Sequence, residues 1–181
     1  MQNYLIKNKG FTLIELLITM SIIAIISAVV FADSSSSEER LALKRAGYQV
    51  AQDLREVEEM ALSSVAEVDC GSKDICGFGL KFNIAESLNS YLIFADCSDD
   101  CPNSNFQYDG EDKIIREVSL EKNIQIQQVL PSPLNVVFTA PDPVVWLNRT
   151  NWGVEAEITL KSSQSENRVV KVNSVGRVEI E

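Results

Sequence analysis

Histidine is absent from this chain of 181 residues. Histidine is the usual base in Ser-His-Asp and Cys-His nucleophile pairs, a common metal ligand and the side chain that titrates near neutral pH. Its absence excludes these three devices and argues against an enzyme. We therefore expect no catalytic residues, no cofactor and no metal site.

Positive charge is also scarce, with 16 Lys+Arg against 26 Asp+Glu and a net charge of -10. Nucleic acids and anionic membranes are bound through clustered lysine and arginine, so DNA is not expected as a partner. A glycine-rich phosphate loop is missing too, because Gly77-Phe78-Gly79 lies in a strand-like run and does not open a helix.

Hydropathy is unevenly distributed, although its mean over the chain is +0.00. Residues 11–32 contain only one ionisable side chain, that of Glu15, and follow a polar segment whose charges are Lys7 and Lys9. As a helix this apolar run would span about 33 Å, enough to cross a hydrocarbon core of about 30 Å. We expect a transmembrane helix. The alternative is a cleaved secretory signal ending before Asp33, which the length of the run disfavours.

The segment Lys9-Gly-Phe-Thr-Leu-Ile-Glu-Leu-Leu17 resembles the prepilin signal of type IV pilins and type II secretion pseudopilins. The resemblance implies that a prepilin peptidase cleaves between Gly10 and Phe11 and that Phe11 becomes the N-methylated first residue. It further implies that Glu15 pairs with the N-terminal amine of a neighbouring subunit during filament assembly. In a low dielectric, such a pair offsets the desolvation of both charges. The alternative is a Glu15 that snorkels to the membrane surface without a partner.

The same resemblance implies a location and a set of partners. The protein would be a single-pass protein of the inner (plasma) membrane, with its head periplasmic or extracellular, and would enter a pilus or pseudopilus after assembly. Its partners would be the prepilin peptidase, other pilins or pseudopilins of the same filament, an inner-membrane assembly platform and, before assembly, membrane lipid.

A polar break of Asp33 and four serines follows the apolar run. Ser35 and Ser36 each precede a glutamate by three positions, a capping-box pattern that predicts a helix start or restart. Downstream, apolar residues recur at helical spacing, which predicts an amphipathic helix packed mainly on a sheet. These residues are Leu43, Val50, Leu54, Val57, Ala61, Val65 and Val68.

Short runs of strand character separated by turn residues follow Cys70. We expect strands at Gly77–Phe82, Tyr91–Ala95, Ile114–Leu120, Ile124–Val129, Val136–Thr139, Val144–Leu147, Val154–Leu160, Arg168–Val172 and Arg177–Ile180. The predicted fold is α+β, a long N-terminal helix with a transmembrane half and an amphipathic half packed on an antiparallel sheet. Its parts are a leader (1–10), a transmembrane or filament-core helix (11–32), the amphipathic continuation (33–69) and the head (70–181).

The head is similar to the globular domain of pseudopilin H and of FimT/FimU-type minor pilins. The similarity rests on CGFGLKF from residue 76, YLIFAD from 91, YDGED from 108 and VGRVEI from 175. It implies a minor subunit with a priming, tip or accessory role, in either a type IV pilus or a type II secretion pseudopilus. The alternative is a pilus-tip module for DNA uptake or adhesion, although residues 33–181 hold 14 Lys+Arg and 25 Asp+Glu.

Four cysteines occur, at Cys70, Cys76, Cys97 and Cys101. A zinc site would more usually show C-x2-C spacing, so we expect disulfides, which require an oxidising compartment. Two connectivities stay open. One nests Cys76–Cys97 inside Cys70–Cys101, and the other joins Cys70 to Cys76 and Cys97 to Cys101. Free thiols are the remaining alternative where disulfide machinery is lacking.

Acidic residues gather near the last two cysteines. They are Asp96, Asp99, Asp100, Asp109, Glu111 and Asp112, with Asn103 and Asn105 between them. Such oxygen ligands can hold calcium, but the D-x-D-x-D-G spacing is missing, so a solvated surface loop is the expectation. Trp146 and Trp152 have no ligand-binding context, and we expect them in a core or an interface.

Overall fold

The computed structural model describes residues 10–63, 68–164 and 166–181, without the side chains of residues 32–36. The chain divides into two compact units, residues 1–38 and 39–181. The elements are α1 (Leu13–Ser63), β1 (Asp74–Phe82), β2 (Ser90–Ser98), η1 (Cys101–Asn103), β3 (Lys113–Ser119), β4 (Ile124–Leu130), β5 (Leu134–Thr139), β6 (Val145–Leu147), β7 (Glu155–Ser162), β8 (Asn167–Asn173) and β9 (Val178–Ile180). This confirms the α+β fold, and each of the nine predicted strands is present.

The first unit contains the apolar part of α1. Its segment Leu13–Phe31 is long and apolar enough to cross a membrane. The prediction of a helix start or restart at Ser35 or Ser36 was wrong, because α1 is assigned as one helix through this segment. Serine costs a helix only a few tenths of a kcal/mol, and residues 32–38 contain neither glycine nor proline, so cooperative propagation passes through this segment.

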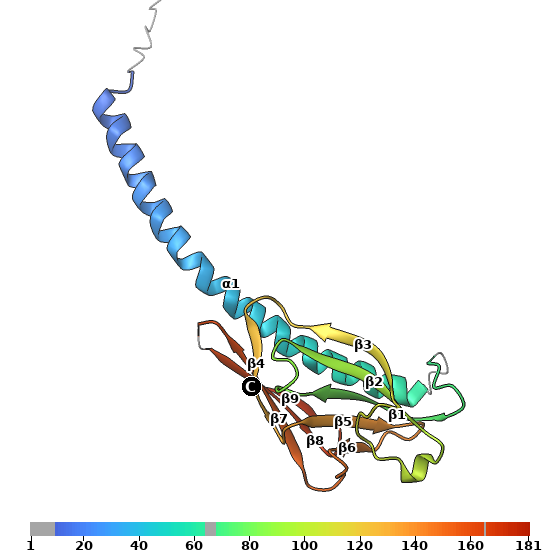
Figure 1. Ribbon diagram of the computed structural model, residues 1–181. Coiled ribbons are helices and arrows are strands. Elements are labelled where there is room, and N and C mark those ends of the chain that lie inside the picture. Colours follow the sequence, from blue (N-terminus) through green and yellow to red (C-terminus); the bar gives the residue numbers. More distant parts are fainter. Residues whose placement is uncertain (1–9, 64–67, 165) are drawn as a thin grey trace, which may run out of the picture. The chain divides into compact units, whose positions relative to one another are not determined.

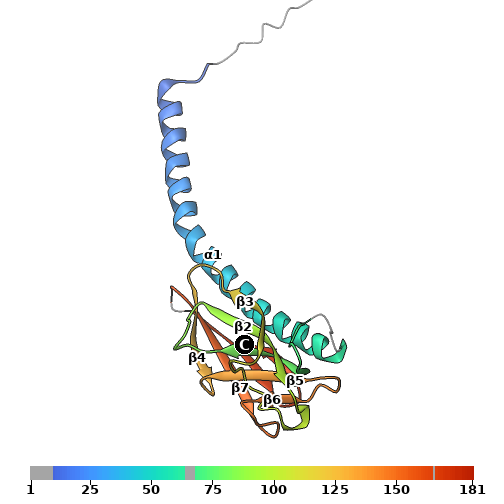
Figure 2. The same ribbon diagram turned by 45° about the vertical axis from the view of Figure 1, so that its right-hand side comes forward.

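The second unit contains two antiparallel sheets and the rest of α1. One sheet has five strands in the order β3-β2-β1-β5-β6, and the other has four in the order β4-β7-β8-β9. Figures 1 and 2 show the C-terminal part of α1, which belongs to this unit, lying against these sheets. The predicted apolar stripe is confirmed from Leu43 to Ala61, where it enters a core shared with both sheets. Val65 lies outside the described residues, and Val68 packs at the edge of the core.

A buried polar link connects α1 to the five-stranded sheet. The Tyr91 hydroxyl donates to Asp53 Oδ2 at 2.5 Å, and Arg116 Nη2 donates to Asp53 Oδ1 at 3.3 Å and to Glu56 Oε2 at 3.0 Å. Burial raises the pKa of the Asp53 carboxyl, while Tyr91 and Arg116 act in the opposite direction. Because a buried carboxylate is costly when unpaired, this link favours one placement of the helix on the sheet.

The outer face of the five-stranded sheet carries a second, smaller apolar cluster, made by Phe94, Phe106 and Val137 with Tyr108 and Trp146 packed against it. Glycine in the central strand β1 makes room for this cluster. A Cβ on the β1 residue Gly79 would lie 2.8 Å from Phe94 Cζ and 2.9 Å from Val137 Cγ2, closer than packed atoms tolerate. The Gly-Phe-Gly run is therefore part of a strand, as predicted, and serves packing.

Candidate functional site

The bond between Gly10 and Phe11 lies in irregular backbone directly before α1. No described atom lies within 4 Å of the place that a side chain on Gly10 would occupy. Phe11 is 84% exposed. Exposed, non-helical backbone is what a peptidase requires at a cleavage site, so this bond is open to cleavage. The assignment of Gly10 and Phe11 to cleavage and methylation stays a prediction.

Thr12 and Glu15 form a reciprocal capping box at the start of α1. The Thr12 backbone N–H and hydroxyl both donate to Glu15 Oε2, each at 2.9 Å. In return, the Glu15 backbone N–H donates to Thr12 Oγ1 at 3.3 Å. This arrangement satisfies backbone donors that the first turn of a helix otherwise leaves unpaired.

The capping box of Thr12 and Glu15 was not predicted from the sequence. The predictions placed this pattern only at Ser35 and Ser36. The signal is present, since Thr12-x-x-Glu15 stands directly before a long apolar run. Glu15 thus has a structural role, capping, besides the proposed pairing with an amine. The cap holds the Glu15 carboxylate beside Thr12. Thr12 directly follows Phe11, the residue that would become the N-terminus after cleavage.

The surroundings of this carboxylate are apolar. The large apolar side chains that flank it, from Leu13 to Phe31, are at least half exposed. Exposed apolar surface of this extent marks a membrane or protein contact. A carboxylate inside such a contact is costly unless it is paired, which is the physical reason to look for a cation that meets Glu15.

The cysteines form two disulfides, Cys70–Cys97 with Cα atoms 5.8 Å apart and Cys76–Cys101 with Cα atoms 4.8 Å apart. Disulfide bonding itself was predicted, but both connectivities considered from the sequence are wrong. The third possible pairing is the one observed.

A β-bulge explains the observed pairing. Along the β1–β2 ladder, Ile75 is opposite Cys97 and Gly77 is opposite Asp96, so Cys76 falls in the bulge between them. A bulge redirects a side chain away from its cross-strand neighbour. Cys76 therefore reaches Cys101 in η1, and Cys97 is left for Cys70. The hairpin pattern of the sequence contains no marker for this shift.

The acidic residues from Asp96 to Asp112 mostly hold the loop's own backbone and side chains. The Ser104 hydroxyl donates to both carboxylate oxygens of Asp96 at 2.7 Å. The backbone N–H groups of Cys97 and Asp109 donate to Asp112 at 3.0 and 2.8 Å. Among the described residues, no group of three or more cysteine or acidic side chains is placed to hold a metal ion.

Acidification from pH 7 to pH 5 is expected to stabilise the head. Burial is the main cause that raises the pKa of Asp112 from 3.8 to about 6. As pH falls through 6, the folded chain takes up a proton at Asp112 before the unfolded chain does, so the unfolding free energy rises. Because Asp112 is only half-buried, we expect the unfolding free energy to rise by about 1 kcal/mol, less than the full pKa shift would give. Urea denaturation at pH 7 and at pH 5 measures this rise.

The variant Asp112→Asn is the control for this pH effect. It removes the titrating group, so its unfolding free energy should change less between pH 7 and pH 5 than that of the unmodified chain. Below about pH 4.5, protonation of the ion-paired Glu86 and Glu121, whose pKa values are lowered by Lys81 and Arg45, opposes the gain. An equal pH dependence in both proteins would refute the role of Asp112.

The two tryptophans differ in environment. Trp146, on β6, stacks on Phe106 with ring centroids 4.5 Å apart and 14° between the planes. Trp152 is 83% exposed. Packing is thus observed for Trp146, whereas the head does not bury Trp152.

Comparison with known proteins identifies the N-terminal segment alone. Residues 5–31 match the prokaryotic N-terminal methylation motif. No curated protein and no solved structure gave a match to the chain. The similarity of the head to pseudopilin H and FimT/FimU-type minor pilins stays a prediction. The matched motif indicates a type IV pilin-like precursor of the kind that prepilin peptidase processes.

Proposed function

From the methylation motif and the capped, exposed apolar helix that follows it, we propose that this protein is a minor pilin or pseudopilin. Prepilin peptidase cleaves it after Gly10, Phe11 is methylated, and the mature subunit enters a type IV pilus or a type II secretion pseudopilus. The observation that carries the proposal is the position of the Glu15 carboxylate. It is held on the first turn of an apolar helix, directly after the exposed Gly10–Phe11 bond.

Cleavage supplies the charge that this site lacks. Hydrolysis of the Gly10–Phe11 bond releases the leader with its lysines and leaves an α-amine on Phe11. In a filament, the amine of one subunit approaches Glu15 of the next. Both hydrogen bonds from Thr12 end on Oε2, so the incoming amine is directed to Oε1. The pair offsets the cost of keeping each charge among apolar side chains.

The head is proposed to prime, cap or decorate the filament outside the cytoplasm. Two disulfides in the head support a location in an oxidising compartment, periplasmic or extracellular. The similarity of its strand and turn segments to minor pilins supports a minor role. Before assembly, the span Leu13–Phe31 anchors the subunit in the inner membrane.

The mass of the mature protein tests this function. When the chain is produced together with a prepilin peptidase, intact-mass measurement should give a polypeptide that starts at Phe11 and carries one additional methyl group. Gly10→Val, whose side chain obstructs the exposed bond, should stay uncleaved in the same cells. A chain that starts at Asp33 would mean an ordinary secreted protein, and a chain that retains its leader beside an active peptidase would also contradict the proposal.

A further inference from the structure

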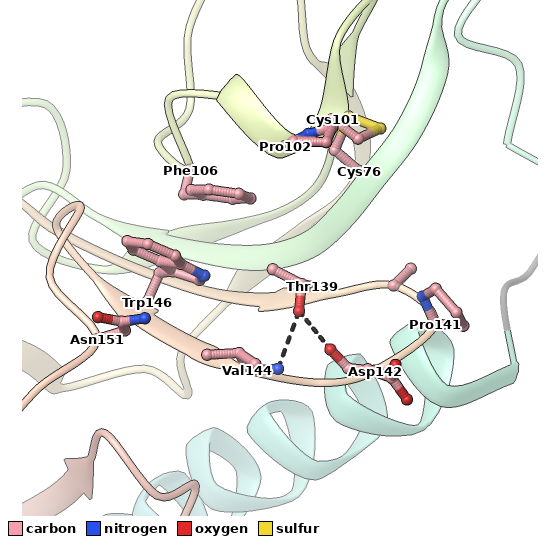
Figure 3. Close-up of a pocket in the computed structure, with 11 residues that line it drawn as sticks. Cys76, Cys101, Pro102, Phe106, Thr139, Pro141, Asp142, Val144, Trp146 and Asn151 are labelled. Carbon is pink, nitrogen blue, oxygen red and sulfur yellow. Dashed lines mark hydrogen bonds between the residues drawn. A yellow bond between two sulfur atoms is a disulfide. The ribbon is translucent and has the colours of Figure 1, made fainter.

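A cavity of about 430 Å³ opens on the outer face of the five-stranded sheet. Figure 3 shows it between two walls, the loop with Pro102 and Phe106 on one side and the β5–β6 hairpin with Pro141 and Val144 on the other. Trp146 lies below Phe106 in this view. Its volume falls within the range of about 300–1,000 Å³ that is typical of ligand sites.

Both walls of the cavity are held by local structure. The Cys76–Cys101 disulfide ties the first wall to β1. In the second wall, the Thr139 hydroxyl donates to the Asp142 carbonyl oxygen and accepts the Val144 backbone N–H at 2.9 Å. These bonds, drawn in Figure 3, fix the hairpin turn. Walls that are ordered before binding lose little conformational entropy when a ligand enters.

Phe106 and Trp146, which stack on each other, both line the cavity. The Trp146 indole N–H is buried and has no hydrogen-bond partner among the described residues. Figure 3 shows this nitrogen on the edge of the ring that faces Thr139. A ligand acceptor can reach it after a rotamer change of the side chains that cover it, a common event at interfaces.

Charge around the cavity favours a basic ligand. The Asp142 carboxylate is exposed at the rim, and it forms no salt bridge with the residues that the structure describes. Residues 33–181 hold 14 Lys+Arg against 25 Asp+Glu, so the surrounding field repels anions. A second cavity of about 460 Å³, which Arg149 also lines, shares Pro102, Phe106 and Trp146 with the first. Two cavities that share one aromatic stack suit an extended chain better than a compact molecule.

We propose that this cavity binds an extended segment of a partner protein in which an apolar side chain lies next to lysine or arginine. The apolar side chain fills the space between the proline-bearing walls, and the basic side chain faces Asp142. A backbone carbonyl of the segment accepts the Trp146 indole N–H, which relieves an unsatisfied buried donor. The site is independent of filament assembly through Glu15, so each can fail without the other.

Titration of the Trp146 indole N–H signal tests the site. The full chain, in lipid nanodiscs, carries ¹⁵N-tryptophan and the exposed-site substitution Trp152→Phe, so the remaining indole signal belongs to Trp146. The probe is the peptide acetyl-Lys-Leu-Lys-amide, added up to about 10 mM. We expect a saturable shift of the signal. Acetyl-Lys-Ser-Lys-amide, which lacks the apolar group, and acetyl-Glu-Leu-Glu-amide, which reverses the charge, should bind at least about tenfold more weakly.

Two variants test whether binding depends on the Asp142 carboxylate itself or on the overall negative charge of the protein. Asp142→Asn should weaken binding of the basic peptide several-fold, and Asp99→Asn, which makes the same charge change away from the cavity lining, should not. No saturable shift with acetyl-Lys-Leu-Lys-amide would overturn the proposal. Equal shifts with all three peptides, or equal effects of the two variants, would overturn it as well, since they would show binding without the proposed selectivity.

Discussion

Glu15→Gln is expected to leave cleavage and methylation unchanged and to reduce incorporation of the subunit into filaments by at least about 100-fold. The amide oxygen of glutamine can still accept the two hydrogen bonds from Thr12, so the helix cap survives while the negative charge is lost. Removing one partner of a buried ion pair costs about 3–5 kcal/mol, which corresponds to this factor or more. Incorporation is measured as the amount of mature subunit in sheared filaments, relative to the membrane fraction.

Thr12→Val is the matched control for the Glu15 prediction. It removes the hydroxyl from the capping box and keeps the carboxylate, so the expected loss is about 1 kcal/mol of helix stability. Its incorporation should therefore stay within several-fold of the unmodified protein. Glu15→Val removes cap and charge together and should behave like Glu15→Gln. If Thr12→Val blocks incorporation and Glu15→Gln does not, Glu15 acts as a helix cap, and the pairing mechanism is wrong.

Removal of the Cys70–Cys97 disulfide by Cys70→Ala with Cys97→Ala is expected to lower the unfolding free energy by about 3–4 kcal/mol. The bridge closes a loop with a sequence separation of 27. A cross-link of this length removes conformational entropy from the unfolded chain, and the chain-entropy relation gives about that value. Urea denaturation under non-reducing conditions, followed by Trp146 fluorescence in the Trp152→Phe background, measures the loss.

Reduction provides the control for this stability loss. Dithiothreitol should destabilise the unmodified protein by more than it destabilises the double alanine variant, because the variant retains only Cys76–Cys101. That bridge has a similar separation of 25, so its removal should have a similar effect. If dithiothreitol leaves the unmodified protein as stable as before, the bridges do not stabilise the head.

The connectivity behind this prediction is open to a direct check with endoproteinase Asp-N, which cleaves before aspartate. Complete digestion without reduction places the four cysteines in four separate peptides, residues 69–73, 74–95, 96–98 and 100–108. The observed pairing links 69–73 to 96–98 and 74–95 to 100–108. The nested pairing would instead link 74–95 to 96–98, and the local pairing would link 69–73 to 74–95.

Features that depend on neighbouring residues could be read from the sequence. The positions of the nine strands follow from alternating apolar residues and the turn residues between them. The apolar stripe of α1 follows from helical spacing, and the candidate assembly site from a short motif around Glu15. The capping box at Thr12 was equally local and could have been found. Each of these signals lies within one element, so no knowledge of the fold is required to detect it.

Features that join distant segments were decided by the tertiary structure. Tyr91 meets Asp53 across 38 positions because β2 lies under α1. The disulfide pairing depends on a single bulge opposite Cys97, since one extra residue in β1 redirects Cys76. The cavity exists because Phe106, from the disulfide-linked loop, stacks on Trp146 of an edge strand. Local patterns determine which elements form. The register between strands, the packing of loops and the partners of buried polar groups depend on all the elements together.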